Sequence, residues 1–267
     1  MTMRWPLALV AVLAIAAPAR AQWLRYPTPG IPRDARGKAN SAAPAPRAAD
    51  GKPDLSGVWQ LGTFCPPEGC VDYPIPREFG NFGASLQGGL PYQPWAAALV
   101  KERTALSGRD DPVAWCKPAG ALRLLTFPPP RKLLQLPGLV VILSERDVTF
   151  RQIFTDGRPL PTDPEPSFNG YSTGRWVKDT LIVETIGLRD GLWIDRAGSP
   201  LTDAARITEK FRRVNVGRLA IEVTVDDPKA YTKPWTVTLN QTLMPDTDLL
   251  EYHCNDNEKD RAHLVGK

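Results

Sequence analysis

The second half of the chain alternates short apolar runs with tight turns, and this pattern restricts the fold more than any other feature. Along 218–226, Leu219, Ile221, Val223 and Val225 share one face, and mainly polar residues occupy the other. Turn residues between such runs favour antiparallel strands joined by short connections. The predicted strands are 55–61, 131–136, 139–145, 148–154, 172–177, 180–186, 207–214, 218–226, 235–244 and 249–254.

A single sheet of about ten strands would leave two edges whose backbone groups are unpaired. Closure of the sheet into a barrel removes both edges, and a barrel of this size can hold a small ligand. We therefore predict an all-β fold, an up-and-down antiparallel meander that closes into a barrel. A two-sheet β-sandwich is the alternative. The one predicted helix is short and spans 94–107, with proline at its start and Ser107-Gly108 at its end.

The N-terminus has the pattern of a secretory signal peptide over residues 1–21. Arg4 supplies the positive charge, Leu7–Ala17 is apolar, and Ala19-Arg20-Ala21 is a cleavage site of the A-x-A type. The apolar run is shorter than the roughly 20 residues that span a bilayer, although an uncleaved anchor is the alternative. Residues 22–50 are rich in proline and alanine, which predicts an extended or disordered leader. Residues 51–267 then form a single domain of a periplasmic or secreted protein.

Four cysteines in an exported protein predict two disulfides. Cys65 and Cys70 flank a Pro-Pro-Glu-Gly turn and are close enough to pair locally, which leaves Cys116 and Cys254 as a long-range pair. The two other pairings of four cysteines remain open. No metal or cofactor is predicted, because paired C-x-x-C units are absent and the chain has only two histidines.

The net charge of +4 is small, and basic residues are scattered among acidic ones. A nucleic-acid-binding protein usually gathers its lysines and arginines into a stripe or patch, and a membrane-surface protein carries a polybasic cluster. Neither pattern occurs here. The expected partner is therefore a small molecule, with no nucleic acid and no membrane insertion after signal cleavage. The oligomeric state stays open.

Gly57-Val58-Trp59 on the first predicted strand resembles the G-x-W motif of lipocalin-type barrels, in which the tryptophan plugs one end. This resemblance implies a lipocalin-like barrel that binds a small molecule. In lipocalins a late arginine commonly packs over this tryptophan. The predicted last strand, 249–254, contains no arginine, and Arg261 lies beyond it.

A longer set of motifs resembles a widespread family of exported bacterial hypothetical proteins, over almost all of 50–267. That family has no assigned reaction, so the resemblance implies a shared fold without a function. Its members carry histidines where this chain has Leu160, Tyr171 and Ser199. The shared motifs are Asp156-Gly157-Arg158-Pro159, Gly174-Arg175-Trp176, Asp179-Thr180-Leu181, Asp226-Asp227-Pro228-Lys229-Ala230-Tyr231-Thr232-Lys233-Pro234-Trp235 and Leu249-Leu250-Glu251-Tyr252.

Several charged residues fall at positions that the alternation directs into the barrel. Glu209 and Arg213 share a face with apolar residues of 207–214, and Glu145 shares a face with apolar residues of 139–145. A buried charge is unfavourable unless it is paired or hydrated, and Glu209 has Arg213 and Arg151 as possible partners. One interpretation is a polar ligand site or an acid–base pair. The others are a structural ion-pair network, or a strand that faces solvent.

Predicted loops supply further candidates. Asp156 and Arg158 lie in a tight Asp-Gly-Arg-Pro turn, where the aspartate is also a common turn residue. Trp193 and Asp195 lie together in another loop and are candidates for an aromatic and acidic rim, and Trp176 is a candidate wall of a cavity. Gly170–Gly174 matches G-x-S-x-G, but strand-like residues follow it where a nucleophile elbow needs a helix.

Two functions remain as hypotheses. The first is a barrel that binds a small amphiphilic or apolar molecule. The second is a cofactor-independent hydrolase, lyase or isomerase that uses carboxylate acid–base chemistry. A deep cavity lined by tryptophan with Glu209 unpaired favours the enzyme, an apolar cavity with every carboxylate paired with arginine favours binding, and a filled interior argues against both. The candidate catalytic residues are Glu209, Asp156 and Glu145, and the candidate ligand-binding residues are Arg213, Arg158, Arg151, Trp176, Trp193 and Asp195.

Overall fold

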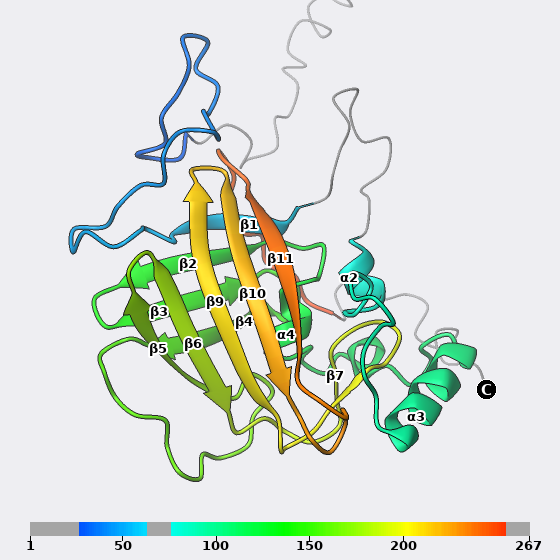
Figure 1. The fold of residues 1–267 in the computed structure, drawn as a ribbon. Helices are drawn as coiled ribbons and strands as arrows, with labels where there is room; N and C mark the ends of the chain where they lie inside the picture. Colours follow the sequence, from blue (N-terminus) through cyan, green and yellow to red (C-terminus); the bar gives the residue numbers. More distant parts are fainter. Residues whose placement is uncertain (1–26, 63–75, 255–267) are drawn as a thin grey trace, which may run out of the picture.

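Nine strands form a closed barrel in the computed structural model, which describes residues 27–62 and 76–254 (Figure 1). Around the barrel the order is β1-β11-β10-β9-β6-β5-β4-β3-β2, and β7 and β8 form a separate two-stranded sheet. The strands are β1 Gly57–Leu61, β2 Arg131–Leu136, β3 Leu139–Ser144, β4 Thr149–Phe154, β5 Tyr171–Val177, β6 Thr180–Ile186, β7 Leu192–Trp193, β8 Pro200–Leu201, β9 Arg206–Asn215, β10 Arg218–Asp226 and β11 Trp235–Leu243.

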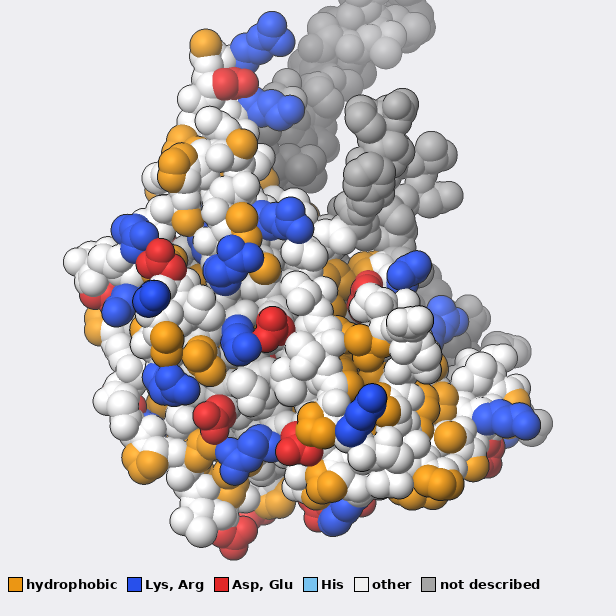
Figure 2. Space-filling model, viewed as in Figure 1, with side chains coloured by type: hydrophobic (Ala, Val, Ile, Leu, Met, Phe, Trp, Pro, Cys, Tyr) orange, Lys and Arg blue, Asp and Glu red, His pale blue; other side chains and the backbone are white. Residues whose placement is uncertain are grey.

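The closed all-β barrel is confirmed, and the sandwich alternative is excluded. On β10 the four predicted inward residues are at most 1% exposed, and they pair in register with buried residues of β9 and β11. The outer face of this wall mixes charges of both signs (Figure 2). Lys210 of β9, for example, lies 2.6 Å from Glu222 of β10. The alternation along this strand therefore separates the core from the surface.

Two features of the barrel differ from the predicted meander. β4 and β5 are parallel, and they pair only through Ile153–Ser172 and Phe154–Thr173. The long connection over 155–170 returns the chain to the same end of the barrel, which a parallel pair requires. The predicted strand 249–254 is wrong, because β11 already has β10 on one side and β1 on the other. No free edge of the barrel remains for that segment.

The predicted helix is confirmed as α3, Pro94–Ala105. The other helical elements are short: α2 Arg77–Gly80, η1 Pro112–Trp115, α4 Ala121–Leu124 and η2 Arg146–Val148. All four residues of α4 are buried, and the carbonyl oxygen of Leu125, which follows α4, accepts from Arg131 and Gln241. α4 thus packs against the start of β2. None of the described helices is long and apolar enough to cross a membrane.

One end of the barrel is closed by Trp59, which is fully buried and donates from Nε1 to the carbonyl of Leu55 at 3.0 Å. The guanidinium of Arg213 lies 4.9 Å from the Trp59 ring. It also donates to four backbone carbonyls around the same end, at 2.6–3.3 Å. An arginine therefore does pack over this tryptophan, but it comes from β9 rather than from the last strand. Burial lowers the pKa of Arg213 to about 10.

The described part of the leader, residues 27–50, consists of turns with two isolated antiparallel bridges, Arg33–Ala39 and Arg47–Pro53, and lies beside the loops at the Trp59 end (Figure 1). The amides of Val216 and Gly217, in the β9–β10 turn, donate to the carbonyls of Ala43 and Ser41 at 2.9 and 2.8 Å. A Cβ placed on Gly217 would lie 2.4 Å from the Cβ of Ser41, so this approach requires glycine. These hydrogen bonds hold residues 41–43 of the leader beside the β9–β10 turn.

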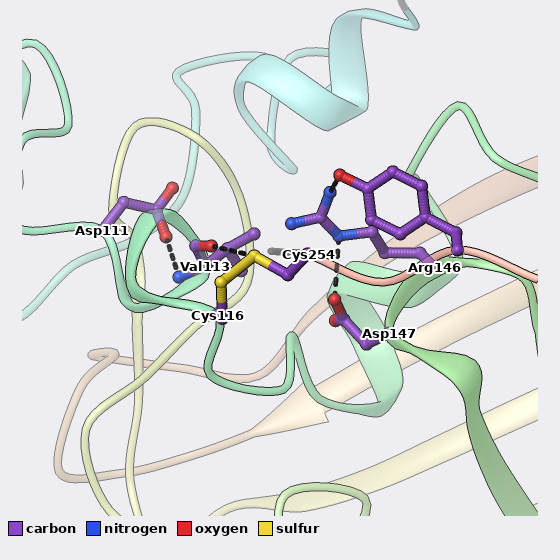
Figure 3. The surroundings of a disulfide bond; sticks show 7 residues. Asp111, Val113, Cys116, Arg146, Asp147 and Cys254 are labelled. Carbon is purple, nitrogen blue, oxygen red and sulfur yellow. Dashed lines mark hydrogen bonds and ion pairs between the residues drawn. A yellow bond between two sulfur atoms is a disulfide. The ribbon is translucent and has the colours of Figure 1, made fainter. Parts of the chain in front are cut away.

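The predicted disulfide between Cys116 and Cys254 is present and joins the end of η1 to the chain beyond β11 (Figure 3). Beside it, Arg146 donates to the hydroxyl of Tyr252 at 2.7 Å and lies 3.0 Å from Asp147. Cys65 and Cys70 lie outside the described residues, as does the predicted signal peptide. A long-range disulfide fits an oxidising compartment outside the cytoplasm.

Candidate functional site

A buried polar network spans four strands inside the barrel and contains two of the predicted site residues, Arg151 of β4 and Glu209 of β9. Both carboxylate oxygens of Glu209 accept from the Arg151 guanidinium, one of them at 3.0 Å. Arg151 also donates to Thr185 at 2.8 Å and to Ser172 at 3.2 Å, and these two hydroxyls lie 2.9 Å apart. The predicted ion pair between Glu209 and Arg151 across the barrel is therefore present.

The four side chains of this network hydrogen-bond to one another. Glu209 is fully buried, and Arg151 is 5% exposed. A bidentate pair with arginine uses both carboxylate oxygens in charge-assisted hydrogen bonds. A general base needs a free oxygen within reach of the substrate proton, and Glu209 presents none. Ser172 lies within β5 and not at a strand-to-helix turn, so the G-x-S-x-G string forms no nucleophile elbow.

The predicted inward position of Glu145 is wrong. The buried face of β3 consists of Val140, Ile142 and Ser144, which is the opposite parity. β3 is apolar on both faces, so alternation along it does not identify the inner one. Glu145 instead follows β3, and its side chain accepts from the amide of Leu250 at 2.8 Å. It holds the C-terminal segment rather than a ligand.

The short β4–β5 pairing leaves an opening in the barrel wall beside Thr149–Gln152. A groove of about 400 Å³ lies there, with Phe150, Phe168 and Tyr171 on its walls, and Arg151 and Ser172 among its lining residues. Phe150 is 61% exposed. The groove thus combines aromatic walls with two members of the buried network.

Asp156 and Arg158 lie next to this groove and pair with each other at 2.6 Å. The Arg158 guanidinium sits 3.9 Å from the ring of Phe154 and 3.5 Å from the hydroxyl of Tyr171. Hydrogen bonds from Arg158 hold the pKa of Asp156 below its usual value. The Asp156 carboxylate is therefore a weak base that is already occupied, and the pair is a fixed part of the turn.

Trp193 and Asp195 do not form a common rim. Asp195 is fully buried and accepts from the amides of Phe82 and Ser199, at 2.8 and 3.0 Å, and from the Ser199 hydroxyl at 2.6 Å. Burial raises the pKa of Asp195. Its hydrogen bonds join the loop at Phe82 to the turn at Ser199, which is a structural role. Trp193 lies under Arg103 and lines a separate cavity of about 300 Å³. Trp176 is half-buried and packs against the core.

A cavity of about 620 Å³, which we call the leader cavity, lies at the Trp59 end between the leader and the barrel. Its polar lining includes Arg213 and the Lys132–Asp248 ion pair, whose nitrogen and oxygen lie 2.6 Å apart. Sequence analysis missed this cavity because the leader was not expected to form a wall. Its apolar lining comes mainly from Pro29, Ile31, Pro46, Val58, Leu133, Leu134, Leu243 and Met244.

No protein-family model matches the chain, and no curated protein or solved structure matches it significantly. The function of this chain is therefore inferred from its own geometry.

Proposed function

We propose that this is an exported protein of the periplasm or extracellular space that binds a small apolar or amphiphilic molecule in the leader cavity. The observation that carries the proposal is the cavity itself. Its volume of about 620 Å³ falls within the range of roughly 300–1,000 Å³ that is typical of small-molecule sites, and its walls are mostly apolar with a few polar groups.

The polar groups of the leader cavity suit a ligand with one polar end. Lys132 and Asp248 form a half-exposed ion pair at the wall, where a hydroxyl or carboxyl group can hydrogen-bond to either partner. Ile31, Val58 and Leu134 offer apolar surface for the remainder of the ligand. Burial of such surface contributes about 25 cal/mol per Å², so the apolar part would supply most of the affinity.

The alternative, a cofactor-independent hydrolase, lyase or isomerase, lacks a free carboxylate among its three candidates. Glu209 is held by Arg151, Asp156 by Arg158, and Glu145 by the amide of Leu250. Both oxygens of Glu209 and of Asp156 accept from arginine, and one oxygen of Glu145 accepts from a backbone amide. Binding without turnover is therefore the better-supported function.

Replacement of Leu134 by tryptophan is expected to weaken binding of an apolar probe at least tenfold, because the larger ring fills part of the cavity. The measurement is a fluorescence titration with N-phenyl-1-naphthylamine. Leu136→Trp is the matched control, since Leu136 lies on the same strand but is 49% exposed and does not line the cavity. Equal probe affinity in both variants would place the bound probe elsewhere.

Acid is expected to release the probe, because Asp246 fastens the leader. Asp246 pairs with Arg33, and its backbone and side chain bond to Thr28. Hydrogen bonding to Arg33 lowers the pKa of Asp246, so this stabilisation is complete above about pH 4, the unfolded value, and is lost as the pH falls through the lowered pKa.

Probe dissociation, followed by stopped flow, should therefore accelerate as the pH falls below about 4 in the native protein. Asp246→Asn should dissociate fast at every pH. Asp203→Asn is the control, because its carboxylate pairs with Lys229 in a loop away from the leader cavity. Circular dichroism at each pH confirms that the barrel stays folded. A rate that is independent of pH in the native protein would contradict the role of Asp246.

A further inference from the structure

Arg131, the first residue of β2, has a buried guanidinium that pairs with no carboxylate of residues 27–62 and 76–254. It is 1% exposed, and it donates to the backbone carbonyls of Leu125 and Phe127. Its Nε has no hydrogen-bond partner among the described residues. An arginine carries five N–H donors, so these two carbonyls leave its hydrogen bonding incomplete.

A small cavity lies beside this side chain. Arg131, Ser144 and Arg151 line it from three consecutive strands, and its volume is about 10 Å³. That is the space of about one water-sized sphere. Ala121, Leu124 and Leu125 cover the cavity from the α4 side, and Ile142 adds an apolar wall. Two arginines and one serine therefore border a space for a single atom or small molecule.

The charges around this cavity do not balance. Arg131 and Arg151 supply two positive charges, and in the part of the chain that the structure describes the one carboxylate bonded to them is Glu209, whose two oxygens both accept from Arg151. The charge of Arg131 therefore has no counter-charge among the described residues. An uncompensated charge in the interior is strongly unfavourable, and burial indeed lowers the pKa of Arg131 to about 9.

We propose that the cavity between Arg131 and Arg151 binds a monatomic anion of the halide class, such as chloride. A halide accepts hydrogen bonds from the free guanidinium N–H groups and from the Ser144 hydroxyl, and it supplies the missing negative charge. A water molecule satisfies the donors but not the charge. Carboxylates, phosphate and sulfate are too large for a space of this volume.

The first test is thermal unfolding in sodium chloride or bromide against sodium gluconate at equal ionic strength. A specific site raises the melting temperature saturably, by about 3–6 °C at a halide concentration ten times the dissociation constant. Arg131→Met should abolish this difference. Arg206→Gln should retain it, because Arg206 is an exposed arginine paired with Glu184 outside the barrel. The same halide effect in Arg131→Met would overturn the proposal.

The second test does not need the variant to fold. Crystals of the native protein grown with sodium bromide should show an anomalous bromine peak between the guanidinium groups of Arg131 and Arg151. Density in the cavity without an anomalous signal would mean that it holds water only, and the halide proposal would be wrong.

Discussion

Replacing Glu209 by glutamine is expected to lower the free energy of unfolding by about 3–5 kcal/mol, because it leaves the guanidinium of Arg151 buried without a counter-charge. In a domain of this size, that corresponds to a fall in melting temperature of roughly 6–20 °C. Urea and thermal denaturation of the native protein and the variant provide the measurement. The loss should exceed that of any variant on the outer face of the barrel.

Glu184→Gln is the matched control, because Glu184 pairs with Arg206 across exposed positions of β6 and β9. Exposed pairs of this kind contribute about 0–1 kcal/mol. The double variant Arg151→Met with Glu209→Leu should recover most of the lost stability, since both charges are then absent. If Glu209→Gln were no more destabilising than Glu184→Gln, the carboxylate would be hydrated, and the enzyme alternative would regain Glu209 as a candidate base.

Removal of the Cys116–Cys254 disulfide, by alanine at both positions, is expected to lower the free energy of unfolding by about 2–5 kcal/mol. The two cysteines are 138 residues apart in a chain of 267, so the bond closes a loop of about half of the unfolded chain. It also holds the C-terminal segment, which contains the Arg146–Tyr252 hydrogen bond. Thermal unfolding without reductant gives the comparison.

The same experiment separates this bond from Cys65 and Cys70. Reductant should lower the melting temperature of the native protein by more than it lowers that of the double alanine variant. Equal melting temperatures for the native protein and the double variant would show that the bond does not restrain the folded barrel.

The sequence predicted the barrel wall best where one face of a strand is apolar and the other polar. β10 has that pattern, and β9 places Glu209 and Arg213 inward as predicted. β3 is apolar on both faces, so its inner face could not be identified, and the prediction for Glu145 was wrong. Periodicity indicates a face only where the two faces differ in polarity.

The features that could not be predicted correctly from the sequence depend on contacts between distant segments. Residues 249–254 have strand-like composition, but β1 occupies the edge that they would need. The leader cavity brings Ile31 and Met244 to one wall although they are far apart in sequence. A composition rich in proline predicted no fixed position for the leader, and the hydrogen bonds from Val216 and Gly217 that hold it have no sequence pattern of their own.

A crystal structure of the protein with bound N-phenyl-1-naphthylamine tests the proposed function most directly, because it locates the ligand. We expect density for the probe between the leader and the barrel, in contact with Ile31, Val58 and Leu134, while Arg151 and Glu209 stay paired. Probe density inside the barrel, with the Arg151–Glu209 pair opened, would contradict the leader cavity as the binding site.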